Sequence, residues 1–168
     1  HCAAPRQEMG VRTLLNILGP LANPAGAAIQ VLGVYDEGLT ELLAKVLLRL
    51  GTQHCFLVHG MDGLDEVTLT DRTRVSEGKG GVVSSYYLDP SDFGLERVRL
   101  KDLAGGTAEE NANIMREILR GRKGPKRDVV CMNAAPAFVA AGKAKTLQEG
   151  YELAGRSIDS GAAMEKLE

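Results

Sequence analysis

The sequence predicts an α/β domain, because two short apolar segments flank a stretch with the periodicity of an amphipathic helix. The apolar segments cover residues 29–35 and 54–59, and both have the composition of strands buried on two faces. Between them, Leu and Val side chains from Leu39 to Leu50 recur at the spacing of one helical face, and Gly51 can end that helix in a left-handed conformation. This order predicts a right-handed crossover between parallel strands, with ligand sites in the loops after their carboxyl ends.

The rest of the chain predicts a small sheet extension followed by helices. Three shorter strands are expected at residues 67–70, 74–76 and 82–88, the first two separated by a turn, and they suggest an antiparallel excursion. From residue 107 onward the pattern becomes helical, and we expect helices at residues 107–119, 128–141, 147–158 and 162–167. The whole predicts a mostly parallel central sheet flanked by helices.

Two of the expected helices begin with a capping signature. Thr107 is followed by Glu110, and Thr146 is followed by Glu149. In such a capping box the hydroxyl and the carboxylate satisfy backbone amides that the first helical turn leaves unpaired. A phosphate site at the first of these starts is disfavoured, because two glutamates in the first turn would repel the anion.

Composition limits the classes of function. With 168 residues and 44% hydrophobic content, the chain predicts one α/β domain over residues 1–168. A formal net charge of -2 gives no electrostatic sign of nucleic-acid binding. No apolar run approaches the ~20 residues of a membrane helix, so we expect a cytoplasmic protein. Because the chain opens with His1 within an arginine-containing segment, we also expect it to be part of a longer protein.

The strongest candidate for chemistry is the acidic segment after the second apolar run. Asp65 and Glu66 are adjacent, so they can serve one site only if the backbone is irregular, and Gly60, Asp62 and Gly63 favour such a backbone. Two carboxylates at the carboxyl edge of a parallel sheet suit Mg²⁺, which leaves its other positions to water and substrate phosphate. The alternative is that one acid caps a turn while the other is solvated.

Other polar residues are less informative on their own. Arg6 can capture a planar carboxylate through two hydrogen bonds, or it can be an ordinary surface arginine. His54 and His59 flank a buried strand and suggest hydrogen-bonded residues at strand ends, since no Ser or Cys near them indicates a nucleophile and its base. The sequence predicts no catalytic triad.

Several longer motifs resemble those of one enzyme family. From Arg6 to Pro24 the chain reads RQEMGVRTLLNILGPLANP, and from Val58 to Glu66 it reads VHGMDGLDE. Both segments closely resemble signatures of anthranilate phosphoribosyltransferases. Further matches in the family's order are Asp92-Phe-Gly-Leu95, Glu110-Asn-Ala112, Asn133-Ala-Ala135 and Ile158-Asp-Ser-Gly161.

The resemblance implies a large domain like that of nucleoside phosphorylases and phosphoribosyltransferases. It implies transfer of phosphoribose from phosphoribosyl pyrophosphate to anthranilate, with Mg²⁺, in tryptophan biosynthesis. Arg6 then resembles the arginine that holds the anthranilate carboxylate, and Pro20 resembles a proline lining the anthranilate channel. Asp65 and Glu66 resemble ligands of a Mg²⁺ ion on the pyrophosphate. The resemblance also implies a homodimer for the full-length protein.

Parts of the family's pattern are expected before His1, namely its glycine-rich pyrophosphate loop and its amino-terminal helical domain. We therefore expect the 168-residue chain alone to be inactive. Two other functions stay open, an inactive paralogue that binds nucleic acid and a pyrimidine nucleoside phosphorylase. The acidic balance, and Arg6 together with Asp65 and Glu66, argue against the first.

Overall fold

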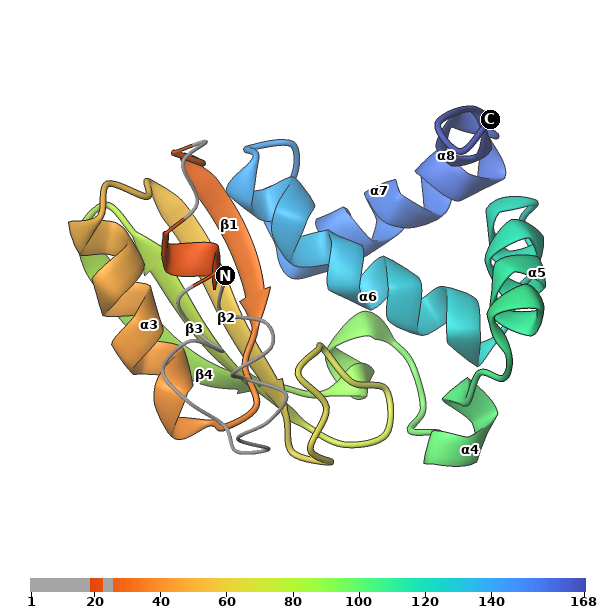
Figure 1. Cartoon of the computed structure of the whole chain (residues 1–168), viewed down its shortest axis with the longest axis horizontal. Coiled ribbons are helices and arrows are strands. Elements are labelled where there is room, and N and C mark those ends of the chain that lie inside the picture. Colours follow the sequence, from red (N-terminus) through yellow and green to blue (C-terminus); the bar gives the residue numbers. More distant parts are fainter. Residues whose placement is uncertain (1–18, 23–25) are drawn as a thin grey trace, which may run out of the picture.

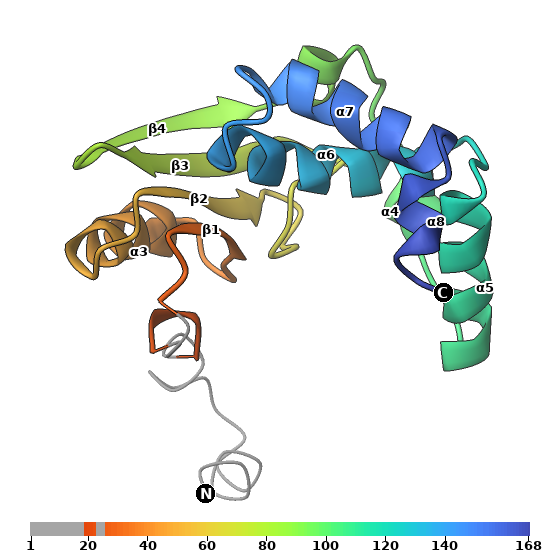
Figure 2. The same ribbon diagram turned by 90° about the horizontal axis from the view of Figure 1, so that it is seen from above.

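The computed structural model describes residues 19–22 and 26–168. It contains a four-stranded sheet in the order β1-β2-β3-β4, with α3 on one face and α6 on the other (Figure 1). Helices α5 and α8 lie beyond the end of the sheet (Figure 2). In chain order the elements are β1 (Ile29–Gly33), α3 (Gly38–Arg49), β2 (His54–Gly60), β3 (Thr73–Lys79), β4 (Val82–Leu88), η1 (Pro90–Phe93), α4 (Leu100–Leu103), α5 (Ala108–Leu119), α6 (Pro125–Ala140), α7 (Leu147–Asp159) and α8 (Ala162–Glu165).

The predicted crossover is confirmed. Strands β1 and β2 pair in parallel from Ile29 opposite His54 to Gly33 opposite Val58, and α3 connects them. Gly51 follows α3 with φ of 98°, a left-handed conformation that glycine adopts without steric cost. The loops after β1 and β2 consequently meet at the same edge of the sheet.

The expectation of a mostly parallel sheet is wrong for the described residues, although the α/β class is confirmed. Only β1 and β2 are parallel in the described sheet, since β2–β3 and β3–β4 are both antiparallel. The β3–β4 hairpin turns through Gly80 and Gly81, whose φ values are 57° and 82°. Such a two-residue turn matches the twist of an antiparallel pair. The antiparallel excursion thus supplies half of the strands.

Residues 67–70, which were expected to form a strand, are irregular. Two of their amides donate to side chains: the Val67 amide donates to Asn133 Oδ1 at 2.8 Å, and the Thr68 amide donates to Thr73 Oγ1 at 3.0 Å. Side-chain acceptors can replace a strand neighbour in this way. The apolar pattern therefore reflects burial without strand pairing, because Val67 and Leu69 are both 1% exposed.

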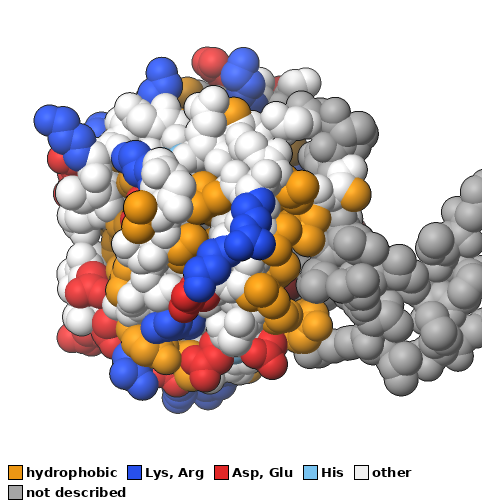
Figure 3. Space-filling model, turned by 90° about the vertical axis from the view of Figure 1, so that its left-hand side faces the viewer, with side chains coloured by type: hydrophobic (Ala, Val, Ile, Leu, Met, Phe, Trp, Pro, Cys, Tyr) orange, Lys and Arg blue, Asp and Glu red, His pale blue; other side chains and the backbone are white. Residues whose placement is uncertain are grey.

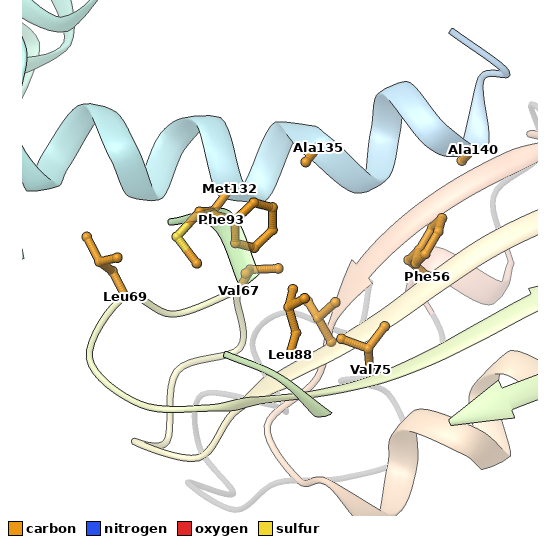
Figure 4. Packing of buried hydrophobic residues seen from close by; sticks show 10 residues of the cluster. Phe56, Val67, Leu69, Val75, Leu88, Phe93, Met132, Ala135 and Ala140 are labelled. Carbon is orange, nitrogen blue, oxygen red and sulfur yellow. The ribbon is translucent and has the colours of Figure 1, made fainter. Parts of the chain in front are cut away.

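The core lies on both faces of β2, whose residues are all buried. Cys55 and Leu57 face α3 and pack with its side chains Leu43, Ala44 and Leu47. Phe56 and Val58 belong to a second cluster, which also includes residues of β3, β4, η1, α6 and the loop after β2. Figure 4 shows Phe56 among these residues. Alternation along a strand buried on both faces explains the continuous apolar run in the sequence.

The carboxy-terminal helices form largely where they were expected. Thr107 caps α5 as a full capping box with Glu110. Thr146 caps α7 through the Glu149 amide, but the Glu149 carboxylate accepts from the Lys145 amide, so the second box is incomplete. Helix α6 begins three residues before the expected start at residue 128, since a proline occupies its first position.

Helices α6 and α7 pack closely because Gly150 lies against Ala135. A Cβ atom on Gly150 would lie 2.6 Å from the Ala135 carbonyl oxygen.

None of the helices in the part of the chain that the structure describes is long and apolar enough to cross a membrane. On the side of the molecule that carries α3, Lys and Arg side chains are interspersed with hydrophobic and acidic ones (Figure 3).

Candidate functional site

The candidate site is built on the loop of residues 61–72, which connects β2 to β3 and is called here the acidic loop. Its base is closed by a hydrogen bond from the Met61 amide to the Arg72 carbonyl at 2.8 Å. Its first turn is closed by the Gly60 amide, which donates to the Leu64 carbonyl at 2.7 Å, and Gly63 within that turn has φ of 93°. The acidic loop therefore has a defined shape although it contains no strand or helix.

The acidic loop folds over the carboxyl end of β1. A Cβ atom on Gly33, the last residue of β1, would lie 1.5 Å from the Asp65 carbonyl oxygen. Only a glycine allows the loop backbone to approach the strand this closely. This contact places Asp65 at the edge where the two parallel strands end.

Asp65 and Glu66 are both exposed and lie on irregular backbone, which adjacent acids need if they are to serve one site. Neither carboxylate forms a hydrogen bond or ion pair with any residue that the structure describes. Among residues 19–22 and 26–168, no group of three or more His, Cys, Asp or Glu side chains could hold a metal ion. A Mg²⁺ ion bound mainly by water and substrate phosphate needs only one or two carboxylates, so the two acids are candidate ligands for such an ion.

Asp62 belongs to the same loop but has a different environment. Its Oδ2 accepts hydrogen bonds from the hydroxyls of Thr68, at 2.5 Å, and Thr70, and its Oδ1 accepts from the Leu64 amide at 3.2 Å. Burial alone would raise the pKa of Asp62, but these hydrogen bonds outweigh it and hold the pKa below its usual value. Asp62 is therefore a charged acceptor at the centre of the loop.

A second anchor connects the acidic loop to α6. The Asn133 side chain accepts from the Val67 amide at 2.8 Å and donates to the Val67 carbonyl at 2.7 Å. It also donates to the Val129 carbonyl one turn earlier in α6, at 3.0 Å. From the sequence, Asp62 was expected only to favour an irregular backbone, and Asn133 was only part of a motif that resembles the family. The threonines that follow Asp62 were a visible signal, whereas the partner of Asn133 lies 66 positions away.

The two histidines of β2 make the strand-end hydrogen bonds that the sequence predicted. Buried His59 is joined through Nδ1 to the Val34 carbonyl at 2.7 Å. His54 is joined through Nε2 to Glu77 Oε1 at 2.7 Å, and its ring packs on Phe56 with the centroids 5.0 Å apart. Both imidazoles therefore connect neighbouring segments of the fold.

The two residues assigned to anthranilate are placed differently. Arg6 lies outside the described residues. Pro20 is half-buried and lines a small cavity with Gln30, Leu47 and Thr52, at the amino end of β1. Asp65 lies at the carboxyl end of that strand, so the described structure does not bring Pro20 to the acidic loop.

The family model of the glycosyl transferase family, a/b domain, matches residues 1–164. The anthranilate phosphoribosyltransferase of Syntrophotalea carbinolica is 54% identical over 167 residues, which cover 99% of this chain and 47% of the relative. That of Moorella thermoacetica is also 54% identical, over 100% of this chain and 50% of its own length. The chain thus spans about half the length of these curated relatives.

Solved structures agree. The anthranilate phosphoribosyltransferase of Thermus thermophilus superimposes with a TM-score of 0.86 at 44% identity, covering 96% of this chain and 48% of that one. The enzyme of Saccharomyces cerevisiae in complex with PRPP and Mg gives a TM-score of 0.87 at 32% identity, covering 99% and 48%. The resemblance found in the sequence motifs is confirmed. By its fold and by the match over residues 1–164, this chain belongs to the glycosyl transferase family and carries its a/b domain.

Proposed function

We propose that this chain is the α/β part of an anthranilate phosphoribosyltransferase. The reaction transfers phosphoribose from phosphoribosyl pyrophosphate to the amine of anthranilate, giving N-(5-phosphoribosyl)anthranilate and pyrophosphate, in tryptophan biosynthesis. The observation that carries the proposal is the pair of exposed carboxylates of Asp65 and Glu66, which have no partner among the described residues, in a chain that resembles this family over its whole length. They sit at the edge of the sheet where ligands of α/β folds bind.

In this proposal Asp65 and Glu66 hold a Mg²⁺ ion against the pyrophosphate of the donor. The ion supplies positive charge for the leaving pyrophosphate. Arg6 binds the anthranilate carboxylate with its planar guanidinium, and Pro20 lines the channel through which anthranilate enters. The protein's main contribution is to orient the amine toward the ribose, since proximity and orientation lower the barrier to a displacement between two bound substrates.

The proposal extends to the longer protein. We propose that a preceding helical domain and a glycine-rich loop complete the pyrophosphate site, and that the full-length cytoplasmic protein is a homodimer. The 168-residue chain alone is then expected to form no phosphoribosylanthranilate. Support comes from the length of the relatives, of which this chain spans about half.

The test compares the full-length protein with a double variant, Asp65→Asn with Glu66→Gln. Formation of phosphoribosylanthranilate is measured while the Mg²⁺ concentration is varied. The wild type should form product, and the double variant should lose most turnover, with partial recovery at high Mg²⁺. Asp71→Asn is the matched control, because Asp71 is an acid of the same loop that pairs with Arg97 at 3.0 Å.

Two results would contradict the proposal. A wild-type protein that cleaves thymidine with phosphate, and forms no phosphoribosylanthranilate, would identify a nucleoside phosphorylase. A double variant with full turnover at limiting Mg²⁺ would show that Asp65 and Glu66 are ordinary loop residues. The melting temperature of each variant should stay within a few degrees of the wild type, since exposed acids contribute little to stability.

A further inference from the structure

The acidic loop carries a third acid, and we propose that Asp62 is a positioning residue that fixes the loop around Asp65 and Glu66 without binding the metal itself. This inference rests on the proposed function, because it assigns a role relative to the Mg²⁺ ligands named there. It concerns a residue only three positions from Asp65, where sequence proximity alone would suggest a third ligand.

The hydrogen bonds of Asp62 reach both sides of the metal-binding pair. The Leu64 amide directly precedes Asp65, and the Thr68 and Thr70 hydroxyls follow Glu66. One carboxylate therefore ties the two ends of the short segment that carries the proposed ligands. Rotation of that segment would break hydrogen bonds to a charged acceptor, which are stronger than those between neutral groups.

The same contacts argue against metal binding by Asp62. A carboxylate offers about four lone-pair positions, and three of those on Asp62 already accept hydrogen bonds. Its Oδ1 is also packed against Gly60, where an added Cβ would lie 2.5 Å from that oxygen. Asp65 and Glu66, in contrast, accept no hydrogen bond from any described residue.

Backbone hydrogen bonds of Thr68 and Thr70 further restrict the segment that contacts Asp62. The Thr68 amide donates to Thr73 Oγ1 at 3.0 Å, while the Thr70 amide donates to Thr68 Oγ1 at 3.0 Å. Thr68 is fully buried, whereas Thr70 is partly exposed. Thr70 is thus the position at which one hydrogen bond to Asp62 can be removed with the least disturbance of the core.

The experiment uses Thr70→Val in the full-length protein, which replaces a hydroxyl by a methyl group of similar size. Thr70→Ser is the matched control, since it keeps the hydroxyl that Asp62 accepts. If Asp62 positions the loop, Thr70→Val should raise the Mg²⁺ concentration for half-maximal turnover by about tenfold, as expected for loss of one hydrogen bond to a charged group. Thr70→Ser should match the wild type, and the Michaelis constant for anthranilate should stay unchanged in both.

A second readout needs neither metal nor substrate. Hydrogen exchange is followed without Mg²⁺ in the wild type, the two Thr70 variants and Asp62→Asn, and residues 61–72 are compared with residues 54–59 of β2 and with α6. Thr70→Val and Asp62→Asn should both speed exchange in residues 61–72 and at the Gly60 amide, which donates to the Leu64 carbonyl, and should leave residues 54–59 of β2 and α6 unchanged.

The outcomes separate this inference from the proposed function. Absence of phosphoribosylanthranilate from the wild type would refute the proposed function, while hydrogen exchange would still decide whether Asp62 holds the loop. If the wild type is active and only Asp62→Asn raises the Mg²⁺ requirement, Asp62 acts directly as a ligand and the inference is overturned. Unchanged exchange in both variants would also overturn it.

Discussion

Asn133 forms two hydrogen bonds with the backbone of Val67. This side chain of α6 thus satisfies the amide and the carbonyl that a neighbouring strand would otherwise pair with. The bonds measure 2.8 Å from the Val67 amide and 2.7 Å to the Val67 carbonyl. Val67 is 1% exposed, so neither of its backbone groups can turn to water without moving the chain. The acidic loop thus depends on a side chain of α6 that lies 66 positions after Val67 in the sequence.

Asn133→Asp should destabilise the protein, because a carboxylate can accept from the Val67 amide but cannot donate to its carbonyl. Leaving a buried acceptor without a donor costs about 1–3 kcal/mol. Urea denaturation followed by circular dichroism measures the loss. Asn113→Asp on α5, where the side chain is exposed, is the matched control and should change the free energy of unfolding little. Equal effects at both positions would contradict the role given to Asn133.

Gly33→Ala should displace the acidic loop. The new methyl group would lie 1.5 Å from the Asp65 carbonyl, so the loop backbone has to move away from β1. We expect a loss of stability of about 1–3 kcal/mol and a loss of turnover in the full-length protein. The control is Gly38→Ala at the start of α3, where the nearest atom is a side-chain oxygen of Asp36 at 3.2 Å. Stability and turnover that stay at wild-type values in Gly33→Ala would exclude this close contact.

Arg6→Ala tests the assignment made from the resemblance. In the full-length protein it should raise the Michaelis constant for anthranilate far more than that for phosphoribosyl pyrophosphate. Loss of a bidentate hydrogen bond to the carboxylate corresponds to a loss of about 1.5–3 kcal/mol in binding free energy. Steady-state kinetics with each substrate varied in turn provides the comparison, and equal effects on both constants would indicate that Arg6 has a structural role.

Asp89 should make the fold sensitive to acid. The Arg97 guanidinium donates to its carboxylate at 2.6 Å, which together with the Ser91 amide lowers the pKa of Asp89 from its ordinary 3.8 to about 2. When folding lowers a carboxyl pKa, the ionised group stabilises the folded protein. This stabilisation is fully present above the unfolded pKa and is lost as the pH falls toward the folded pKa.

The stability advantage of the wild type over Asp89→Asn should therefore be constant near neutral pH and disappear between about pH 4 and pH 2. Denaturant midpoints measured over this range provide the check, with Glu96→Gln, an exposed neighbour, as the control. A stability difference that persists unchanged to pH 2 would contradict this assignment.

Local patterns predicted much of the fold. The periodicity of α3, the apolar run of β2 and the Thr107 cap of α5 all depend on residues close in sequence, and all are confirmed. The strand expected at residues 67–70 is absent because its hydrogen-bond partners include a side chain far along the chain. The prediction of a mostly parallel sheet was wrong for a related reason. The direction in which β3 and β4 pair depends on how the chain after β2 folds back onto the sheet, and both pair antiparallel.

The acids of the proposed site were visible in the sequence, but the different environments of their carboxylates were not. Asp65 and Glu66 stand out as adjacent acids after a buried strand, and the structure places them at the expected edge. In the folded loop, the Asp62 carboxylate accepts hydrogen bonds from two threonine hydroxyls, whereas those of Asp65 and Glu66 accept none from the described residues. The spacing of the three acids in the sequence does not distinguish Asp62 from Asp65 and Glu66. They differ in the hydrogen bonds that their carboxylate oxygens accept in the folded loop.

The glycine pair that ends β3 also bears on how the protein reaches its folded state. Gly80 and Gly81 bring Lys79 opposite Val82, so the β3–β4 pair closes a very short loop. Strand β1 meets β2 only after the chain has passed through α3, a longer loop with a larger entropic cost. Because short-range contacts form before long-range ones, the hairpin is expected to assemble first and to serve as the template on which β2, and then β1, are added.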